Sequence, residues 1–362
     1  MLRICHITDS LNVGGLERTL VHAVSGLTDF GHCVFCLRTK GALAGELEAR
    51  GIEVREFGFT DGMSLKDFFY LVSQLKASRA DIVHSHGFFP SMWGRPAGVA
   101  AGIPRRIVHV QNVYYGITGK PLWKYKLLIP FATRYIAVSQ AVRTCLIEYV
   151  GVPAAKISVV YNAAVDLAAA PGRRREVRAR LGVADTDILV GGLGRLEEHK
   201  GFAYLLEAVA ACRASGLPVK ALLVGDGPDR GPLEEKIARL GLAGQVTLAG
   251  MRLDIGDHLS AMDIFVQPST VREGLPLSLA EAASCGLSLV ATDIGGNPEI
   301  VAEGANGFII APRDVNQLAG KLRALCADPG MRERMGRESS RIWQERFSVE
   351  KMIGGLREVY GR

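Results

Sequence analysis

The stretch Gln267–Glu299, QPSTVREGLPLSLAEAASCGLSLVATDIGGNPE, decides the fold that we expect for this chain. It predicts a strand end, a polar loop, and then a helix that is entered through Glu273-Gly274-Leu275-Pro276. Pro276 suits a first helical turn, because its fixed φ fits there and its missing N–H is not needed. Gly286 ends this helix, and Leu287–Thr292 follow as a buried strand.

The amides after Glu273 lie at the N-terminus of this predicted helix, where an anion such as phosphate is favoured. Glu273 and Glu281 flank the site, and a continuous helix would set them about 12 Å apart along its axis. Paired carboxylates of glycosidases need about 5–10 Å, so that chemistry is disfavoured. We therefore expect the two glutamates to accept hydrogen bonds from different parts of one long ligand. The structural alternative is a helix cap together with a solvated glutamate.

The residue pattern of the whole stretch is more specific than the spacing of the two glutamates alone. The pattern E-x7-E within PSTVREGLPLSLAEA, followed by GGNPE, resembles the retaining glycosyltransferases of family 4, the group 1 transferases. The resemblance implies an α/β chain with the GT-B fold, in which two Rossmann-like, doubly wound parallel-sheet domains face a central cleft. It also implies a nucleotide-sugar donor. Glu273 then positions the transferred sugar, Glu281 holds the ribose hydroxyls, and Gly274, Leu275, Pro276 and Leu277 line the donor site.

Length and composition agree with a globular two-domain protein. The chain has 362 residues, of which 48% are hydrophobic and 22% are charged. No apolar run approaches a membrane span, and Met1–Ile4 begins a strand rather than a signal peptide. The seven cysteines are scattered in apolar contexts, so we expect core packing for the C-x-x-C at Cys33 and Cys36, and reduced thiols in the cytoplasm.

The positive charge is concentrated in the first half. Residues 1–170 hold 18 Lys/Arg against 12 Asp/Glu, a net +6, whereas residues 171–362 hold 25 against 25. Between Ile82 and Ile147 there are eight basic residues and no acidic one, which indicates an anionic partner or surface. Lys120–Arg134 mixes four basic residues with aromatic and aliphatic ones. It is either an amphipathic patch on the inner face of an anionic membrane or an ordinary half-buried helix.

The first strand, Arg3–Thr8, leads to a glycine turn. Gly14-Gly15 precede an apolar-periodic helix, and glycine there lets the backbone approach a ligand. The G-x-G-x-x-G dinucleotide fingerprint is absent. The turn resembles the G-G-x-E element of family 4, whose loop faces the donor phosphates.

Strand–helix alternation continues to His84-Ser85-His86-Gly87, which closes a strand at its carboxyl end. H-x-H is a pattern of metal pairs, but no carboxylate or cysteine follows nearby, and alternation points both rings the same way. We expect His86 to face the cleft on the acceptor side and His84 to be structural. Gln111 also belongs to the acceptor side; family members often carry His there, and an amide still binds a sugar hydroxyl.

The run Ala163–Arg175, AAVDLAAAPGRRR, breaks the alternation and predicts a hinge between domains. We therefore expect domains over 1–165 and 166–342, and the resemblance implies that the first binds the acceptor and the second binds the nucleotide-sugar. The resemblance implies that a C-terminal helix, residues 343–362, crosses back to the first domain.

The second domain begins with two cations. Arg195 and Lys200 lie in the loop between the strand Ile188–Gly192 and the helix Phe202–Ala214, where a diphosphate is suited and solvated surface is the alternative. The loop resembles the family's G-R-L-x-x-x-K-G element, whose Arg and Lys grip the nucleotide diphosphate. Met251 follows another strand, where the family holds the nucleobase with backbone groups.

These features predict a retaining, metal-independent glycosyltransferase of the hexosyltransferase class. The resemblance implies a glycan acceptor, for which a lipid-linked precursor of cell-envelope polysaccharide is one candidate, and we expect Glu273, Arg195 and Lys200 to carry the chemistry. The sequence shows no metal-ligand cluster, so we expect neither a metal nor another cofactor, and no nucleic-acid partner. The alternatives are a non-catalytic nucleotide-sugar-binding protein and a GT-B epimerase. The donor, the acceptor and the oligomeric state are not specified by these motifs.

Overall fold

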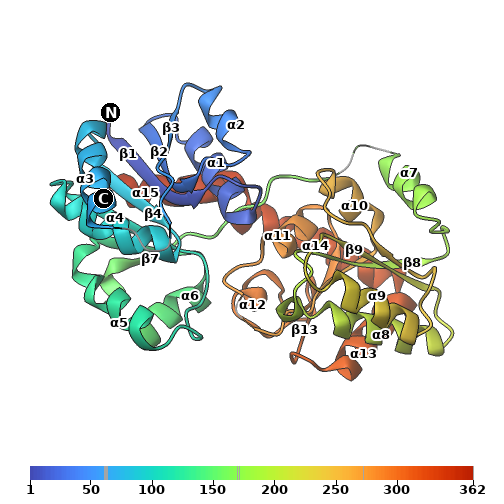
Figure 1. Ribbon diagram of the computed structural model, residues 1–362. Coiled ribbons are helices and arrows are strands. Elements are labelled where there is room, and N and C mark those ends of the chain that lie inside the picture. The colour runs from blue at the N-terminus through green and yellow to red at the C-terminus, as the bar shows by residue number, and fades with distance from the viewer. Residues whose placement is uncertain (61–63, 169, 171, 272, 362) are drawn as a thin grey trace. The chain divides into compact units, whose positions relative to one another are not determined.

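Two parallel sheets organise the chain, as the strand–helix alternation predicts (Figure 1). The computed structural model describes residues 1–362 except 61–63, 169, 171, 272 and 362. The first unit comprises Met1–Ala163 together with Val349–Arg362, and the second comprises Ala164–Ser348. The predicted assignment of acceptor binding to 1–165 and donor binding to 166–342 stays a prediction.

Unit 1 contains a seven-stranded sheet with the order β3-β2-β1-β4-β5-β6-β7, and every neighbouring pair is parallel. The order reverses direction between β1 and β4, which makes their carboxyl ends a topological switch point. The strands are β1 (Arg3–Ser10), β2 (Gly31–Thr39), β3 (Glu53–Glu56), β4 (Ile82–His86), β5 (Arg105–Val110), β6 (Arg134–Ala137) and β7 (Ile157–Val159).

Helices cover both faces of this sheet because successive strand residues point to opposite sides. On β1, Ile4 packs with residues of α1 and α15, whereas Cys5 and Ile7 pack with residues of α3 and α4. The helices are α1 (Gly15–Gly26), α2 (Ala44–Glu48), α3 (Leu65–Ser78), α4 (Phe88–Ala100), α5 (Gly119–Leu127), α6 (Gln140–Cys145) and α15 (Val349–Gly361).

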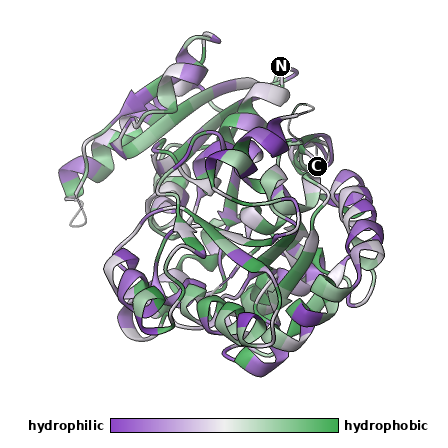
Figure 2. Ribbon diagram, turned by 90° about the vertical axis from the view of Figure 1, so that its right-hand side faces the viewer, coloured by the Kyte–Doolittle hydropathy of each residue, from purple (hydrophilic) through white to green (hydrophobic). Residues whose placement is uncertain are grey.

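Unit 2 contains a six-stranded parallel sheet with the order β10-β9-β8-β11-β12-β13, whose switch point lies between β8 and β11. Its strands are largely hydrophobic, and polar residues gather on the helices around them (Figure 2). The strands are β8 (Ile188–Leu193), β9 (Val219–Val224), β10 (Val246–Leu248), β11 (Ile264–Gln267), β12 (Ser288–Thr292) and β13 (Gly307–Ile310). The helices are α7 (Arg173–Arg180), α8 (Phe202–Ala214), α9 (Arg230–Arg239), α10 (Ile255–Ala261), α11 (Leu277–Ser284), α12 (Asn297–Ile300), α13 (Val315–Ala327) and α14 (Pro329–Ile342).

The predicted hinge is wrong at its C-terminal end. Arg173, Arg174 and Arg175 do not belong to a linker but begin α7. This helix is held by ion pairs from Arg173 to Asp257 at 2.7 Å and from Arg174 to Asp263 at 2.6 Å. Ala169 and Pro171, which belong to the same predicted hinge, lie outside the described residues.

Two further expectations need adjustment. Pro276 is the N-cap residue of α11 rather than its first helical residue, with φ −72° and an extended ψ of 116°. The helical pattern after Met331 is interrupted at Ser348, which is extended between a π-helical turn and α15. The C-x-x-C prediction is confirmed, because Cys33 and Cys36 are buried free thiols within β2. Among the described residues, no helix is both long and apolar enough to cross a membrane.

Candidate functional site

The switch point of unit 2 brings together two of the predicted residues. Lys200 follows β8 and Glu273 follows β11, and these strands are neighbours in the sheet. Lys200 Nζ lies 2.7 Å from Glu273 Oε1. Glu273 is only 6% exposed, so this ion pair is largely shielded from solvent. Ligands of open α/β sheets bind at this position, outside the carboxyl ends of the strands.

A polar network fixes the carboxylate of Glu273. Ser269 Oγ donates a hydrogen bond to Glu273 Oε1 at 2.6 Å, and Gln267 Nε2 contacts the same oxygen at 3.3 Å. Ser278 Oγ in turn donates to Gln267 Oε1 at 2.9 Å, which orients the amide. Gln267 and Ser269 are buried, so the carboxylate has a single preorganised position.

Glycines allow the loops around this carboxylate to touch through their backbones. Gly201 has φ +72°, and a Cβ there would lie 2.0 Å from the carbonyl oxygen of Pro268. Gly295 has φ +55°, and its Cβ would lie 1.8 Å from the carbonyl oxygen of Glu273. The G-G of GGNPE is thus required where this loop packs against the backbone of Glu273.

Two helix N-termini follow these loops. The helix α8 begins at Phe202, two residues after Lys200, and α11 begins at Leu277, four residues after Glu273. Both contribute backbone N–H groups that favour an anion. Gly274, Leu275 and Pro276 are buried on the way into α11, and Glu281 is half-buried within it.

Arg195 and Met251 are exposed at the edge of unit 2. The side chain of Arg195 is 72% exposed and pairs with Glu197 at 2.9 Å, and His199 also approaches Glu197, at 3.3 Å. Met251 follows β10 and is 76% exposed. The structure therefore brings Lys200, but not Arg195, into contact with Glu273.

The predicted residues of unit 1 lie near its own switch point. Gly14 is the extended N-cap residue of α1, and Gly15 is its first residue. Gln111, which follows β5, accepts a hydrogen bond from Asn162 Nδ2 at 2.6 Å. His86 is buried, and its Nε2 lies 3.1 Å from His6 Nδ1. As predicted, His84 and His86 point the same way, with ring centroids 4.1 Å apart.

Sequence reasoning missed the partners of these two histidines. From the sequence alone the H-x-H is not expected to be a metal pair, because no further ligand follows it nearby. The structure supplies His6 from β1 and His109 from β5, both buried beside His84. The alternation of residues within Ile4-Cys5-His6 and Ile107-Val108-His109 determines which face of the sheet each histidine occupies. It predicts that the histidines are neighbours only once the register of the strands is known.

Two doubly wound units, with a lysine–glutamate pair and two helix N-termini at the switch point of the second, are the architecture of a GT-B glycosyltransferase. Comparisons with known proteins agree. Residues 13–168 match Glycosyltransferase Family 4, and residues 173–341 match Glycosyl transferases group 1. This chain belongs to that family, and it is an enzyme that transfers a sugar from a nucleotide-sugar.

Individual proteins show the extent of the similarity. The alpha-maltose-1-phosphate synthase of Mycobacterium tuberculosis is 30% identical over 320 residues, which cover 80% of this chain and 81% of that protein. An Escherichia coli UDP-Gal:alpha-D-GlcNAc-diphosphoundecaprenol alpha-1,3-galactosyltransferase is 29% identical over 308 residues, 82% of this chain and 79% of that protein. The crystal structure of Anabaena HepE in complex with UDP matches with a TM-score of 0.90 at 27% identity, over 99% of this chain and 100% of that one.

Proposed function

We propose that this glycosyltransferase transfers a hexose from a UDP-linked donor to a lipid-linked glycan precursor, with retention of the anomeric configuration and without a metal ion. The donor class is supported by HepE, which was crystallised with UDP and with UDP-glucose. The acceptor class is supported by the Escherichia coli relative, whose name specifies a diphosphoundecaprenol acceptor.

The contact between Lys200 and Glu273 carries the donor proposal. A leaving nucleotide diphosphate develops negative charge, and a preorganised cation beside two helix N-termini stabilises that charge. Lys200 has this position at the start of α8, and its partner Glu273 is fixed by Ser269 and Gln267. The exposed ion pair between Arg195 and Glu197 contributes little free energy. Arg195 can therefore leave Glu197 and bind the diphosphate as well.

The chemical step follows from these positions. The bond between the anomeric carbon and the phosphate oxygen breaks, and the acceptor oxygen forms its bond to that carbon on the same face. The acceptor proton passes to the departing phosphate oxygen. Lys200 stabilises the phosphate, Glu273 holds hydroxyls of the transferred sugar, and Glu281 binds the ribose. The positive charge of Lys200 and the helix amides takes the role that a metal has in other transferases.

An apolar pocket in unit 1 suits the lipid of the acceptor. It has a volume of about 520 Å³, and its lining includes Lys120 and Lys124. Long apolar chains bind in such pockets, and two ammonium groups attract a diphosphate. The remaining lining is apolar and comes from α4, α5 and the residue after α5: Phe88, Phe89, Met92, Trp93, Pro96, Pro121, Leu127 and Leu128.

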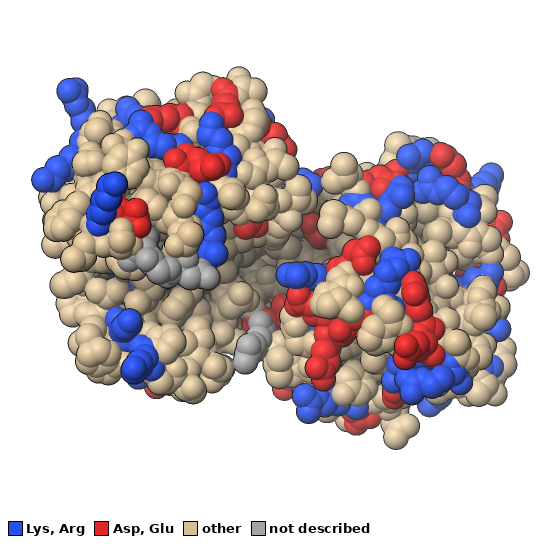
Figure 3. All heavy atoms as spheres, viewed as in Figure 1, with Lys and Arg blue, Asp and Glu red and all other residues tan. Residues whose placement is uncertain are grey.

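Arg95 is buried, so it does not contribute to the exposed positive charge that the sequence predicts for this region. Its guanidinium is 1% exposed, lies over the Tyr125 ring at 4.2 Å and bonds the Tyr135 hydroxyl at 3.2 Å. Arg105 and Arg106 are bonded to backbone carbonyls. The exposed charge in this part of unit 1 therefore includes the lysines of α5, where Figure 3 shows basic side chains surrounded largely by uncharged surface.

Exposed apolar residues accompany those lysines. Trp123 is 62% exposed and Leu127 is 55% exposed, while Tyr125 is the buried residue of α5. Aromatic and aliphatic side chains beside lysines are typical of a surface that lies on an anionic membrane. We propose that α5 docks on the cytoplasmic face of the membrane, where a lipid-linked acceptor is available.

The test is turnover with a panel of UDP-, GDP- and ADP-hexoses, in excess EDTA, with and without a prenyl-diphosphate glycan acceptor. We expect sugar transfer from a UDP-hexose that persists in EDTA, and a product whose anomeric configuration, read by NMR, equals that of the donor. Loss of turnover in EDTA that Mg²⁺ or Mn²⁺ restores would falsify the metal-free account. Donor binding without turnover would instead indicate a sensor, and conversion of the donor sugar without acceptor would indicate an epimerase.

A further inference from the structure

Histidines from three adjacent strands meet on one face of the sheet of unit 1. His6 on β1 pairs in register with His84 on β4, and His86 on β4 pairs with His109 on β5. Residues in register on parallel strands point to the same side, as do residues two apart on one strand. The four rings are therefore neighbours, and each is at most 4% exposed.

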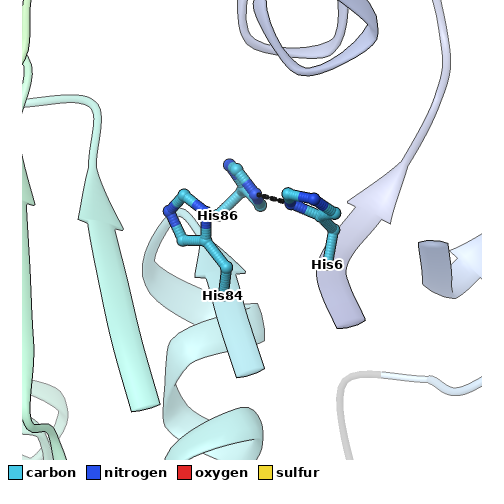
Figure 4. A group of neighbouring side chains, drawn as sticks. All are labelled: His6, His84 and His86. Carbon is cyan, nitrogen blue, oxygen red and sulfur yellow. Dashed lines mark hydrogen bonds between the residues drawn. The ribbon is translucent and has the colours of Figure 1, made fainter. Parts of the chain in front are cut away.

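Three of these rings converge on one point. His6, His84 and His86 each offer a ring nitrogen, and these nitrogens all lie within 4.8 Å of one another. Figure 4 shows His86 of β4 reaching toward His6 of β1, with their contact drawn as a dashed line, and the ring of His84 on the other side of His86 in this view. A few tenths of an ångström to about 1 Å of side-chain movement brings such nitrogens to the roughly 2 Å distance of a metal–imidazole bond.

The hydrogen bonds of the outer ring nitrogens determine where a lone pair lies. The carbonyl of Leu27 only accepts, so His32 Nε2, at 2.9 Å, carries a proton. In neutral His32 the other nitrogen, Nδ1, then accepts from His6 Nε2 at 3.1 Å. His6 Nδ1 is consequently unprotonated and directs its lone pair toward His86.

By the same logic His86 Nε2 donates to His6 Nδ1, and a bound metal would take the place of that proton. His84 Nδ1 is bonded to the hydroxyl of Tyr360 at 2.6 Å, while its Nε2 is buried with no hydrogen-bond partner among the described residues. His109 stacks on His84, with ring centroids 5.3 Å apart. Both of its ring nitrogens are also buried without a hydrogen-bond partner in the described part of the chain. Buried polar atoms of this kind are rare, and an absent ion is one of their explanations.

We propose that His6, His84 and His86 bind a divalent transition-metal ion, with Zn²⁺ the best match to three imidazoles. Neutral imidazole is a preferred ligand of Zn²⁺, Cu²⁺ and Ni²⁺, and Mg²⁺ and Mn²⁺ favour oxygen. His32 and Tyr360 are the outer partners that orient His6 and His84, as in established histidine metal sites. His86 then serves as a ligand rather than as the predicted acceptor contact.

Burial lowers the pKa of His6, His84 and His86 well below the usual range of histidine. The ion would lie inside unit 1, and the partners of its ligands come from β2 (His32) and α15 (Tyr360), so its role is to hold that face of the sheet together. The site involves neither Lys200 nor Glu273, and the two proposals stand independently.

The test begins with the wild-type protein from cells grown with added Zn²⁺. After dialysis we expect one metal ion per chain by mass spectrometry, and after removal of the metal we expect Co²⁺ to give the visible spectrum of nitrogen ligation. His84→Gln should abolish stoichiometric binding. His22→Gln, which changes a half-buried histidine of α1 outside the group, should leave binding unchanged.

A second variant covers the case in which His84→Gln does not fold. His32→Gln removes an outer partner only, and should weaken metal affinity about 10–100-fold. Wild-type protein that binds no stoichiometric metal, equal binding in all variants, or a thiolate-to-cobalt charge-transfer band from a cysteine site would overturn the proposal. The donor proposal fails in a different way, because activity lost in EDTA would there be restored by Mg²⁺ or Mn²⁺, which bind poorly to three histidines.

Discussion

The ammonium of Lys200 and the carboxylate of Glu273 meet at 2.7 Å across the switch point of unit 2, although 73 residues separate them in the chain. The contact joins the G-R-L-x-x-x-K-G loop to the first glutamate of E-x7-E. In the proposed function both loops contact the same donor: Lys200 stabilises its phosphate, and Glu273 holds the sugar that is transferred.

Lys200→Met should lower kcat about 10²–10³-fold, the usual loss when one preorganised donor to a developing anion is removed. The half-buried pair between Lys236 and Glu207 offers a control in the same unit, and Lys236→Met should leave kcat unchanged. Steady-state kinetics with the UDP-hexose measures both. Comparable losses in the two variants would show that the effect of Lys200 is not specific to the site.

Glu281 and Glu273 should differ in what they bind. If Glu281 contacts the ribose, Glu281→Ala removes binding from ground and transition states alike and weakens free UDP binding by about 1.5–3 kcal/mol. Glu273→Ala should lower kcat with UDP affinity nearly intact, because it contacts the transferred sugar. Calorimetry with UDP decides the assignment, and a reversed order of affinities contradicts it.

Gly295→Ala should perturb the site through the backbone. The new Cβ would overlap the carbonyl oxygen of Glu273, and the residue would also keep a positive φ. Gly304 has φ +75° with nothing within 4 Å, so Gly304→Ala isolates the conformational cost of about 1–2 kcal/mol. We expect Gly304→Ala to retain full turnover, and Gly295→Ala to lose both more stability and turnover. Thermal unfolding and kcat together separate the two effects.

Membrane docking should depend on α5. Wild-type protein should bind anionic vesicles and release from them as salt rises, because screening weakens the contribution of each lysine, about 1 kcal/mol. The double variant Trp123→Ser, Lys124→Glu should lose this binding, whereas Phe69→Ser, at a 65% exposed position of α3, should not. Vesicle co-sedimentation measures the difference. Equal binding to neutral vesicles contradicts the electrostatic part.

Arg178 should contribute strongly to the stability of unit 2. It is 4% exposed, pairs with Asp263 at 3.0 Å and donates to the carbonyls of Ala184 and Asp187. Arg178→Met removes these hydrogen bonds, whereas Asp263 keeps its ion pair with Arg174, and should cost about 1.5–3 kcal/mol. Arg180→Met, at an exposed position whose ion pair with Asp254 is 3.9 Å long, should cost less than about 1 kcal/mol. Urea unfolding of both variants tests the difference.

The sequence predicts those parts of the molecule whose signal is local. Strand and helix alternation predicts both sheets, and G-R-L-x-x-x-K-G and E-x7-E predict Lys200 and Glu273 as members of one site, because both loops follow strands whose carboxyl ends meet. The helix α7 was missed because its three arginines follow small residues and Pro171. Their partners Asp257 and Asp263 lie more than 80 residues further on.

The histidine group and the burial of Arg95 could not be predicted in the same way. His6, His84 and His109 become neighbours only through the register of β1, β4 and β5, which no single segment encodes. Arg95 follows Met92 and Trp93 in what looks like an ordinary amphipathic helix. Its removal from solvent depends on Tyr125 and Tyr135, which arrive from two later elements.

The helix α15 has a consequence for biosynthesis. Unit 1 begins the chain, but α15 supplies Tyr360 beneath His84, and Arg105 is bonded to the carbonyls of Val359 and Tyr360. Unit 2 is one continuous segment, so a ribosome delivers all of it before the last helix of unit 1 exists. Unit 1 therefore cannot complete its fold until all of unit 2 has been synthesised, and until then the face of its sheet that α15 covers stays open to a chaperone or an ion.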